Sequence, residues 1–237
     1  QVSVVDASAM TTDHVDVRED YNQMTMSPDG HWVVCYYDEG AVDPDDPPTE
    51  GARSFNEVSL VHVEALTHHP MVVGFNPRDV QFSDDGTRAV VVSDAWLAVV
   101  DLEADSLDPV RVQISSDTVD PPEAEEVVLT PDGRYALIRQ FGVTDLVLVD
   151  LDTGTLDYVP VGNNPTDIDV SPDGREAIAV ARGSSELWIY DLEDPTSDPD
   201  VIPMPAEEVF GSLVLSPDGD TGILFSTASG AARYGSW

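Results

Sequence analysis

Three carboxylates, those of Asp79, Glu126 and Asp167, stand at the same place in a recurring pattern, four residues before a turn tetrapeptide. Carboxylates that converge repel one another, so they must be hydrated, share a proton or bind a cation. Ligands that are all oxygen suit Ca²⁺ or Mg²⁺ better than zinc. The three are therefore candidate metal ligands, and Ca²⁺ is the cofactor they would hold. The alternative is a hydrated channel in which they accept backbone N–H groups of neighbouring repeats.

A second group of candidate residues lies in loops. The segment 38–56 carries Asp43, Asp45 and Asp46 among three prolines, but it has no Gly and no distant Glu at the set positions that an EF-hand loop requires. We interpret it as an acidic surface loop, and alternatively as a contact for a partner or a cation. Asn163 and Asn164 precede Asp167 in the best copy of the repeat, and they are candidate ligand or partner residues.

Other chemistries find little support in the residue types. The five histidines have no spacing that would give zinc three or four ligands, and the single cysteine lies in an apolar run; they are His14, His31, His62, His68, His69 and Cys35. The chain has no Gly-rich phosphate loop, no G-x-S-x-G elbow and no Cys–His pair. These observations favour a non-catalytic protein.

The candidate residues are positioned by an internal repeat. Tetrapeptides of the type SPDG occupy residues 27–30, 83–86, 130–133, 171–174 and 216–219, so they start 56, 47, 41 and 45 residues apart. Proline sets φ at the first corner of such a turn and glycine supplies a positive φ, which predicts a tight hairpin. A period of about 40–50 residues is typical of propeller blades.

Each repeat reads as four strands, a to d. Strand a precedes the turn, strand b follows it, strand c ends in a signature such as VVDAS or VLVDLD, and strand d is more polar. The a strands are predicted at 23–26, 79–82, 126–129, 167–170 and 212–215, and the d strands at 14–18, 70–74, 110–114, 158–161 and 201–204. The sequence thus predicts an all-β protein, a single propeller domain over residues 1–237.

The order of the strands leaves two arrangements open. The chain opens with a c–d pair, continues through four complete repeats and closes with an a–b pair. The first pair would complete the last blade and close a ring of five without a free edge. The alternative is that the chain is part of a larger propeller.

The stretch VGNNPTDIDVSPDGREAIAV, followed by LWIYDLED, and the opening SVVDAS resemble the YVTN-type β-propeller repeat of surface-layer, lactonase-like and other secreted microbial proteins. The resemblance covers nearly the whole chain and implies a WD40-like frame whose ligands meet the face built by the d–a and b–c loops. The aligned column would converge there; it comprises Gln23, Asp79, Glu126, Asp167 and Ser212. The turn SDDG lacks the proline, and the first repeat carries an insertion.

Charge restricts the class of partner. The chain has 46 acidic residues and 10 basic ones, and all ten basic residues are Arg, which gives a formal net charge of −36. Nucleic acids and anionic membranes require a basic surface, so neither is expected as a partner. There is no apolar run of 18 residues that would predict a transmembrane segment. Self-repulsion of this size is tolerated where salt screens it, although acidic residues also simply favour solubility.

The leading hypothesis is a non-catalytic extracytoplasmic module that binds a protein, a glycan or a cation through the d–a and b–c loop face. The chain begins at Gln1 without Met, so its targeting segment is expected to lie outside this sequence. One alternative is an enzyme of the lactonase-like or quinoprotein-dehydrogenase-like type, and another is a module of a larger surface assembly. Neither the ligand nor the oligomeric state follows from the sequence.

Overall fold

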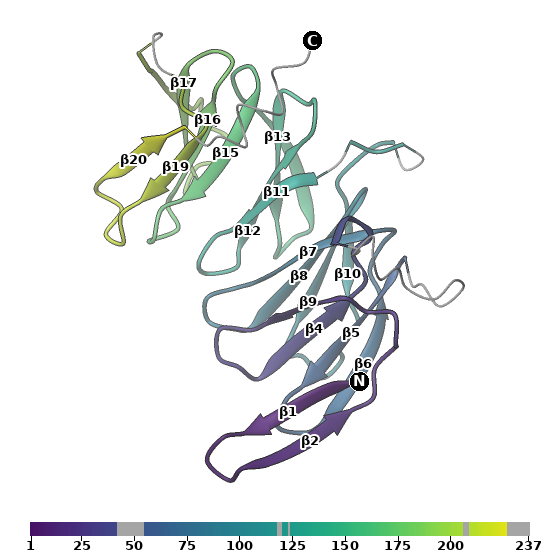
Figure 1. Cartoon of the computed structure of the whole chain (residues 1–237). Coiled ribbons are helices and arrows are strands. Elements are labelled where there is room, and N and C mark those ends of the chain that lie inside the picture. Colours follow the sequence, from purple (N-terminus) through teal and green to yellow (C-terminus); the bar gives the residue numbers. More distant parts are fainter. Residues whose placement is uncertain (42–54, 118–119, 123, 206–208, 227–237) are drawn as a thin grey trace. The chain divides into compact units, whose positions relative to one another are not determined.

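The computed structural model describes residues 1–41, 55–117, 120–122, 124–205 and 209–226. This part of the chain contains twenty strands and one short 3-10 helix, η1 (Glu39–Ala41), and no helix that is long and apolar enough to cross a membrane. The strands form four four-stranded antiparallel sheets and two two-stranded ones (Figure 1). The chain divides into two compact units, 1–121 and 122–237, and each is described by itself.

The first unit holds three sheets. Their strands are β1 (Val2–Asp6) with β2 (Thr11–Val15); β3 (Gln23–Met26), β4 (Trp32–Tyr36), β5 (Glu57–His62) and β6 (Thr67–Val72); and β7 (Pro77–Phe82), β8 (Arg88–Ser93), β9 (Trp96–Asp101) and β10 (Val110–Gln113). In each four-stranded sheet the strands pair in chain order, so the a strand and the d strand form the two edges.

The second unit repeats this plan. Its strands are β11 (Ala124–Leu129), β12 (Tyr135–Gln140), β13 (Asp145–Asp150) and β14 (Thr155–Pro160); β15 (Pro165–Val170), β16 (Glu176–Ala181), β17 (Glu186–Asp191) and β18 (Asp200–Pro203); and the pair β19 (Ser212–Leu215) and β20 (Gly222–Phe225). The prediction of an all-β chain built from four-stranded antiparallel blades is confirmed.

The a–b turns share one set of hydrogen bonds. In the turn after β15, the Ser171 hydroxyl donates to Asp173 Oδ1 at 2.7 Å and accepts the N–H of Glu176 at 2.9 Å, while Asp173 accepts the N–H of Arg175 at 3.2 Å. Gly174 has a φ of 73° and donates to the Ser171 carbonyl. The other four turns make the same bonds, including SDDG, which has no proline. Serine or threonine and aspartate therefore recur because their side chains hold the turn.

The c–d connections differ in length. Three have four residues (7–10, 63–66 and 151–154), and two have eight (102–109 and 192–199). Each c strand ends in a side chain that accepts a backbone N–H two or three residues later; this residue is Asp6, Asp101, Asp150 or Asp191 in four blades, and His62 in the fifth. The residue that ends the signature of strand c is thus the one that stabilises the c–d turn.

Three of the predicted d strands were placed too late. The strands β2, β6 and β14 each start three residues before the predicted ranges 14–18, 70–74 and 158–161. The first three residues of β2 and β6 are polar and exposed, as in the segment Thr-His-His of β6, and those of β14 include a single apolar residue, Leu156, so an apolar pattern does not reveal them. The backbone of the c strand recruits them into the sheet regardless of their side chains.

The cores lie between successive sheets. In the first unit, Val34, Leu60 and Val91 belong to one buried cluster, and in the second unit Leu137, Leu146 and Ala179 belong to another. Cys35 is buried beside Val15 and Val61, and its burial raises the pKa of the thiol to about 11. The apolar run that contains Cys35 thus places this cysteine in the core.

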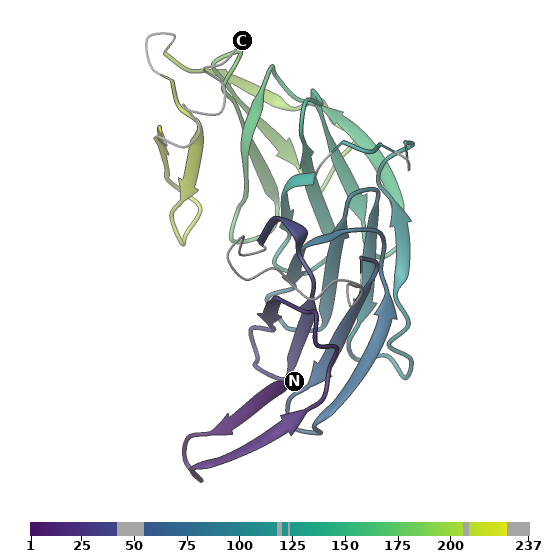
Figure 2. The same ribbon diagram turned by 45° about the vertical axis from the view of Figure 1, so that its right-hand side comes forward.

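The two two-stranded sheets are the strand pairs that were predicted to complete one blade and so close the ring. The hairpin β1–β2 (purple in Figure 2) and the hairpin β19–β20 are each a separate two-stranded sheet, one in each unit. Completion of one by the other, and with it the prediction of a single five-bladed domain, stays a prediction, as does the alternative of a larger propeller.

Candidate functional site

A β-bulge precedes each of the three candidate carboxylates. The register shifts between Pro77 and Asp79 in β7, between residues 124 and 126 in β11, and between residues 165 and 167 in β15. In β7 and β15 the proline is preceded by an asparagine with a positive φ, 59° at Asn76 and 53° at Asn164. A bulge redirects the side chains that follow it. The local sequence Asn-Pro-x-Asp therefore aims Asp79 and Asp167, whereas the bulge before Glu126 forms without it.

In the second unit, Glu126 belongs to a partly buried ion-pair cluster. Arg139 lies directly across from it on β12, and the Arg139 Nε donates to Glu126 Oε2 at 3.0 Å. The Arg139 Nη1 donates to Glu125 and, at 3.5 Å, to the carbonyl of Pro165 at the start of β15. The Arg139 side chain is only 11% exposed. One guanidinium thus joins two carboxylates of one inner strand to the backbone of the next.

Glu126 also shares a hydrogen bond with Asp167. Burial raises the pKa of Glu126 to about 7, against the opposing effect of Arg139, and the negative charge of Asp167 adds to the rise. Burial likewise raises the pKa of Asp167, although the N–H of Leu213 and the hydrogen bond with Glu126 favour its ionised form. This arrangement makes Glu126 the donor and Asp167 the acceptor of a shared proton.

The carboxylates of β15 reach the next inner strand. Asp167 Oδ2 accepts the N–H of Leu213 at 2.5 Å, and Asp169 Oδ2 accepts the N–H of Leu215 at 3.1 Å. The strands β15 and β19 belong to different sheets but lie side by side (Figure 1). Side chains therefore replace the missing backbone ladder between two sheets. For Asp167, the interpretation that it accepts a backbone N–H of the neighbouring repeat is confirmed.

Asp79 has different partners. It lies on β7 of the first unit, where its Oδ1 accepts the N–H of Val80 and its Oδ2 accepts Gln81 Nε2, both at 2.8 Å. The structure thus brings Glu126 and Asp167 together and describes Asp79 in the other unit. In the described residues, no three His, Cys, Asp or Glu side chains gather where they would hold a metal ion. A calcium site built by the three carboxylates stays a prediction.

The loop candidates divide into two groups. Asp43, Asp45 and Asp46 lie outside the described residues. The backbone carbonyls of Asn163 and Asn164 accept the N–H groups of Gly183 and Arg182 at 2.8 and 3.1 Å. These bonds tie the entry of β15 to the turn after β16, so a structural role of the Asn backbone is visible.

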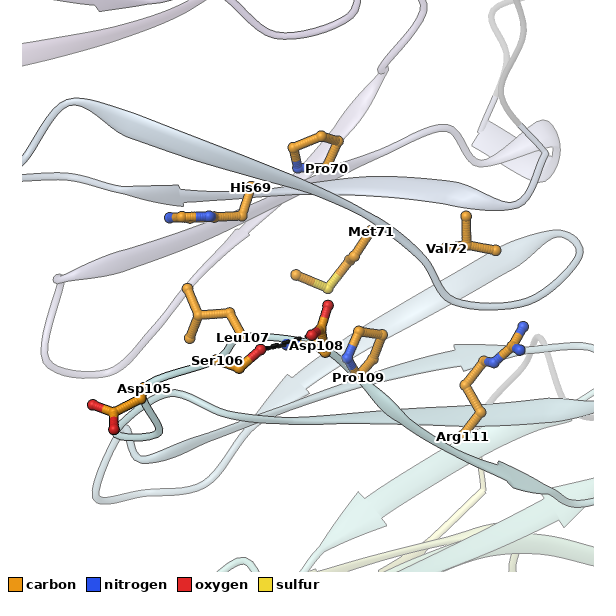
Figure 3. Close-up of a pocket in the computed structure, with 10 residues that line it drawn as sticks. All are labelled: His69, Pro70, Met71, Val72, Asp105, Ser106, Leu107, Asp108, Pro109 and Arg111. Carbon is orange, nitrogen blue, oxygen red and sulfur yellow. Dashed lines mark hydrogen bonds between the residues drawn. The ribbon is translucent and has the colours of Figure 1, made fainter.

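Two recesses lie at the outer edges of the sheets, where the sequence had indicated no site. The first, of about 630 Å³, lies between β6 and the long connection 102–109 (Figure 3). The second, of about 270 Å³, lies between β14 and the long connection 192–199. We call them the first and the second outer groove. Both are built from a d strand and from the eight-residue c–d connection of the next sheet.

The predictions made from the sequence do not include Arg139 or the outer grooves. Arg139 stands in the otherwise apolar segment YALIRQ, and a cation in a strand of this kind, in a chain with ten, is a signal that could have found it. The grooves have a weaker signal, the spacing of eight rather than four residues between strands c and d.

Comparison with known proteins supplies the architecture. The chain matches no protein-family model and no curated protein. Among solved structures it is similar to the dihydro-heme d1 dehydrogenase NirN in complex with DHE, with 19% identity and a TM-score of 0.56 over 84% of this chain and 41% of that one. It is also similar to the β-propeller domain of Cps50 (Swd1) from Myceliophteria thermophila, with 13% identity and a TM-score of 0.57 over 88% and 62%. The fold is a β-propeller.

A third similar structure is a functionally unknown protein from Desulfotomaculum acetoxidans DSM 771, with 16% identity and a TM-score of 0.55 over 94% of this chain and 68% of that one. This chain spans about two fifths of the length of the NirN chain and about three fifths of the length of the Cps50 (Swd1) chain. Because one of these carries the name of a dehydrogenase and the other is a propeller domain without such a name, the fold alone does not assign an activity.

Proposed function

We propose that this chain is a non-catalytic propeller module of the YVTN type that acts outside the cytoplasm and binds a partner protein. The observation that carries the proposal is the way its carboxylates are used. Glu126, Asp167 and Asp169 are engaged by Arg139, by one another and by backbone N–H groups of β19. These groups hold the inner strands together, so recognition is left to the outer strands and connections.

The extracytoplasmic location is part of the same proposal. A net charge of −36 with arginine as its only cation suits a medium whose salt shortens the Debye length, about 8 Å near physiological ionic strength. The melting temperature is expected to rise as NaCl is increased from low to molar concentration, because repulsion is screened. A melting temperature that falls over this range would speak against adaptation to a saline medium.

The proposal is tested by affinity purification of the tagged native protein from its own cells, with quantitative mass spectrometry. We expect one partner protein in near-stoichiometric amount that survives a wash at moderate salt. A native protein that purifies alone, with an intact mass equal to this chain, would contradict a binding module. A covalent mass much larger than this chain would instead establish the alternative of a module in a longer surface protein.

The enzyme alternative is favoured by one observation, the shared proton of Glu126 and Asp167, because a carboxyl with a pKa of about 7 is suited to acid–base chemistry. A panel of lactones, followed with a pH indicator, tests it. We expect no difference in rate between the parent and the variant Asp167→Asn. Turnover that the parent shows and the variant lacks would establish a lactonase-like enzyme in place of a binding module.

The cation hypothesis has a direct test in thermal unfolding. The melting temperature of the parent and of Asp167→Asn is compared with CaCl₂ and with chelator. A calcium-dependent rise that the variant loses would establish a cation site at the inner strands, and an equal response of the two proteins would remove it.

A further inference from the structure

The two outer grooves are the same structural element in two copies. In each, the wall on one side is a d strand, β6 or β14, at the free edge of its sheet. The opposite wall is an eight-residue c–d connection that ends in Asp-Pro, at Asp108 and Asp198. The three four-residue connections have no such wall. Groove and long connection therefore occur together, once in each unit.

The second outer groove combines an apolar floor with a negative rim. Leu137 and Leu148 form part of its floor, and the buried Tyr190 donates its hydroxyl to the carbonyl of Pro160 at 2.8 Å, which fixes the end of β14. Asp157 lies across from Leu148 on β13, so its side chain shares the face of the sheet that lines the groove, whereas the adjacent Tyr158 points to the other face. This recess therefore joins an acidic side chain to a rigid apolar floor.

The charged residues that line the second groove are all acidic: Asp157 on β14, Asp191 at the end of β17, and Asp198 in the connection. Asp191 is held by the N–H groups of residues 193 and 194. In the described part of the chain, the side chains of Asp157 and Asp198 have no hydrogen bond or ion pair. Their carboxylates are therefore available to a cationic group from outside.

The first outer groove differs in charge and gives an internal comparison. Its lining includes His69 and Arg111 as well as Asp105 and Asp108 (Figure 3). The Arg111 guanidinium lies 5.8 Å from the centre of the Trp96 ring, and the Ser106 hydroxyl donates to Asp108 at 2.7 Å. A cation is thus already present in this groove. The same architecture carries a mixed rim in one unit and an acidic rim in the other.

We propose that the second outer groove binds an extended segment of a partner protein that carries arginine or lysine. The cationic side chain lies between the carboxylates of Asp157 and Asp198 and forms ion pairs with them. A volume of about 270 Å³ is below the range of about 300–1,000 Å³ for drug-sized ligands and suits one or two side chains of a peptide. The inference rests on the proposed function and names the surface that performs it.

The test uses a fluorescein-labelled peptide, GSGRGRGS, and its Gln-for-Arg analogue as probes of the whole protein, followed by fluorescence anisotropy at about 0.15 M NaCl. Two double variants are compared, D157N/D198N in the second groove and D105N/D108N in the first. Each removes two of the negative charges, so both variants have the same net charge. Any difference between them reports where the peptide binds. Circular dichroism checks that both are folded.

We expect the parent to bind the Arg peptide and not the Gln analogue. D157N/D198N is expected to weaken binding about tenfold, and D105N/D108N by less than about twofold, because only the former removes the paired carboxylates. Backbone amide shifts on titration are expected at residues 157–160 and 196–199.

Equal weakening by the two double variants would mean that the peptide senses the overall charge, and it would overturn the groove as a site. Absence of binding to the parent would overturn it as well. Neither result would affect the proposed function, because that is judged by the native partner. Conversely, a native protein without a partner would contradict the proposed function even if the peptide bound.

Discussion

Two sets of carboxylates in the 122–237 unit have opposite surroundings. On the inner strands, Glu126 and Asp167 are partly buried and have raised pKa values. Glu126 is hydrogen-bonded to Arg139, and Asp167 to the backbone of β19. At the outer edge, Asp157 and Asp198 are exposed and without such partners in the described residues. The same residue type thus holds the frame at one edge of the sheets and remains open to solvent at the other. Burial and bonding, and not abundance, separate the two roles in an acidic chain.

The largest effect is expected from Arg139→Met. Removal of the guanidinium leaves Glu125 and Glu126 without their cation in a site where Arg139 is 11% exposed, which typically costs about 3–5 kcal/mol. Urea unfolding followed by fluorescence measures it. The matched control is Arg175→Met, whose partner Glu193 is at 3.5 Å on an exposed surface, with an expected loss below about 1 kcal/mol. Equal losses in the two variants would show that the inner cluster has no special role.

Glu126→Gln is expected to change how stability depends on pH. The folded-state pKa of Glu126, about 7, lies above its ordinary value of 4.5, so the parent keeps the full contribution below about pH 4.5 and loses it as the pH rises through 7. Glutamine cannot ionise. The variant should therefore match the parent near pH 4.5 and exceed it by about 1–3 kcal/mol at pH 8. Urea titrations at both pH values check this, and parallel pH profiles would contradict the raised pKa.

The turn carboxylates form an intermediate case, exposed but bonded. The hydroxyl of Ser171 lowers the pKa of Asp173, helped by the N–H of Arg175. A carboxyl of this kind contributes stability above its unfolded pKa, and the contribution is lost as the pH falls through the lower folded value. Asp173→Asn should therefore destabilise the protein at neutral pH, and the difference should shrink in acid. A difference that is constant with pH would mean that the turn does not need the charge.

The smallest effect is expected at the outer edge. Asp157→Asn and Asp198→Asn should each leave the free energy of unfolding within about 0.5 kcal/mol of the parent, because neither carboxylate holds another group in the described structure. Thermal unfolding at neutral pH is the measurement. A loss as large as that of Arg139→Met would erase the distinction between the two edges.

Much of the frame was predictable because its signals are local. The turn tetrapeptide located the strands 23–26 and 212–215 to the residue, since a hairpin turn depends on its own side chains. Alignment of the turns also put Glu126 and Asp167 in one column, and the resemblance to a propeller implied that residues of this column converge. The starts of β2, β6 and β14 did not, because a polar edge strand is selected by its neighbour's backbone.

The rest of the site depends on residues that do not recur. The partner of Glu126, Arg139, lies across the a–b turn at a position that pairs with the same column in every blade, but in the other blades this position holds Tyr36, Val92, Val180 or Phe225. An outer groove joins β14 to a connection some 40 residues later, so no sequence window contains both walls. Repeats reveal what recurs, and these features are the ones that differ between blades.

The self-contained a–b turns also bear on how the chain is made. Each turn closes through bonds that span at most five residues, as in the contact from Glu176 to Ser171, so it needs no distant segment in order to form. A ribosome adds about 5–20 residues per second, so it needs about 2–11 s to reach the next of these turns, while a β-hairpin forms in about 1–10 μs. Every a–b turn therefore has time to form many times over before the next one is synthesised, and the propeller can grow by the addition of strand pairs whose register is already set, although a pair becomes stable only when it packs on its neighbour.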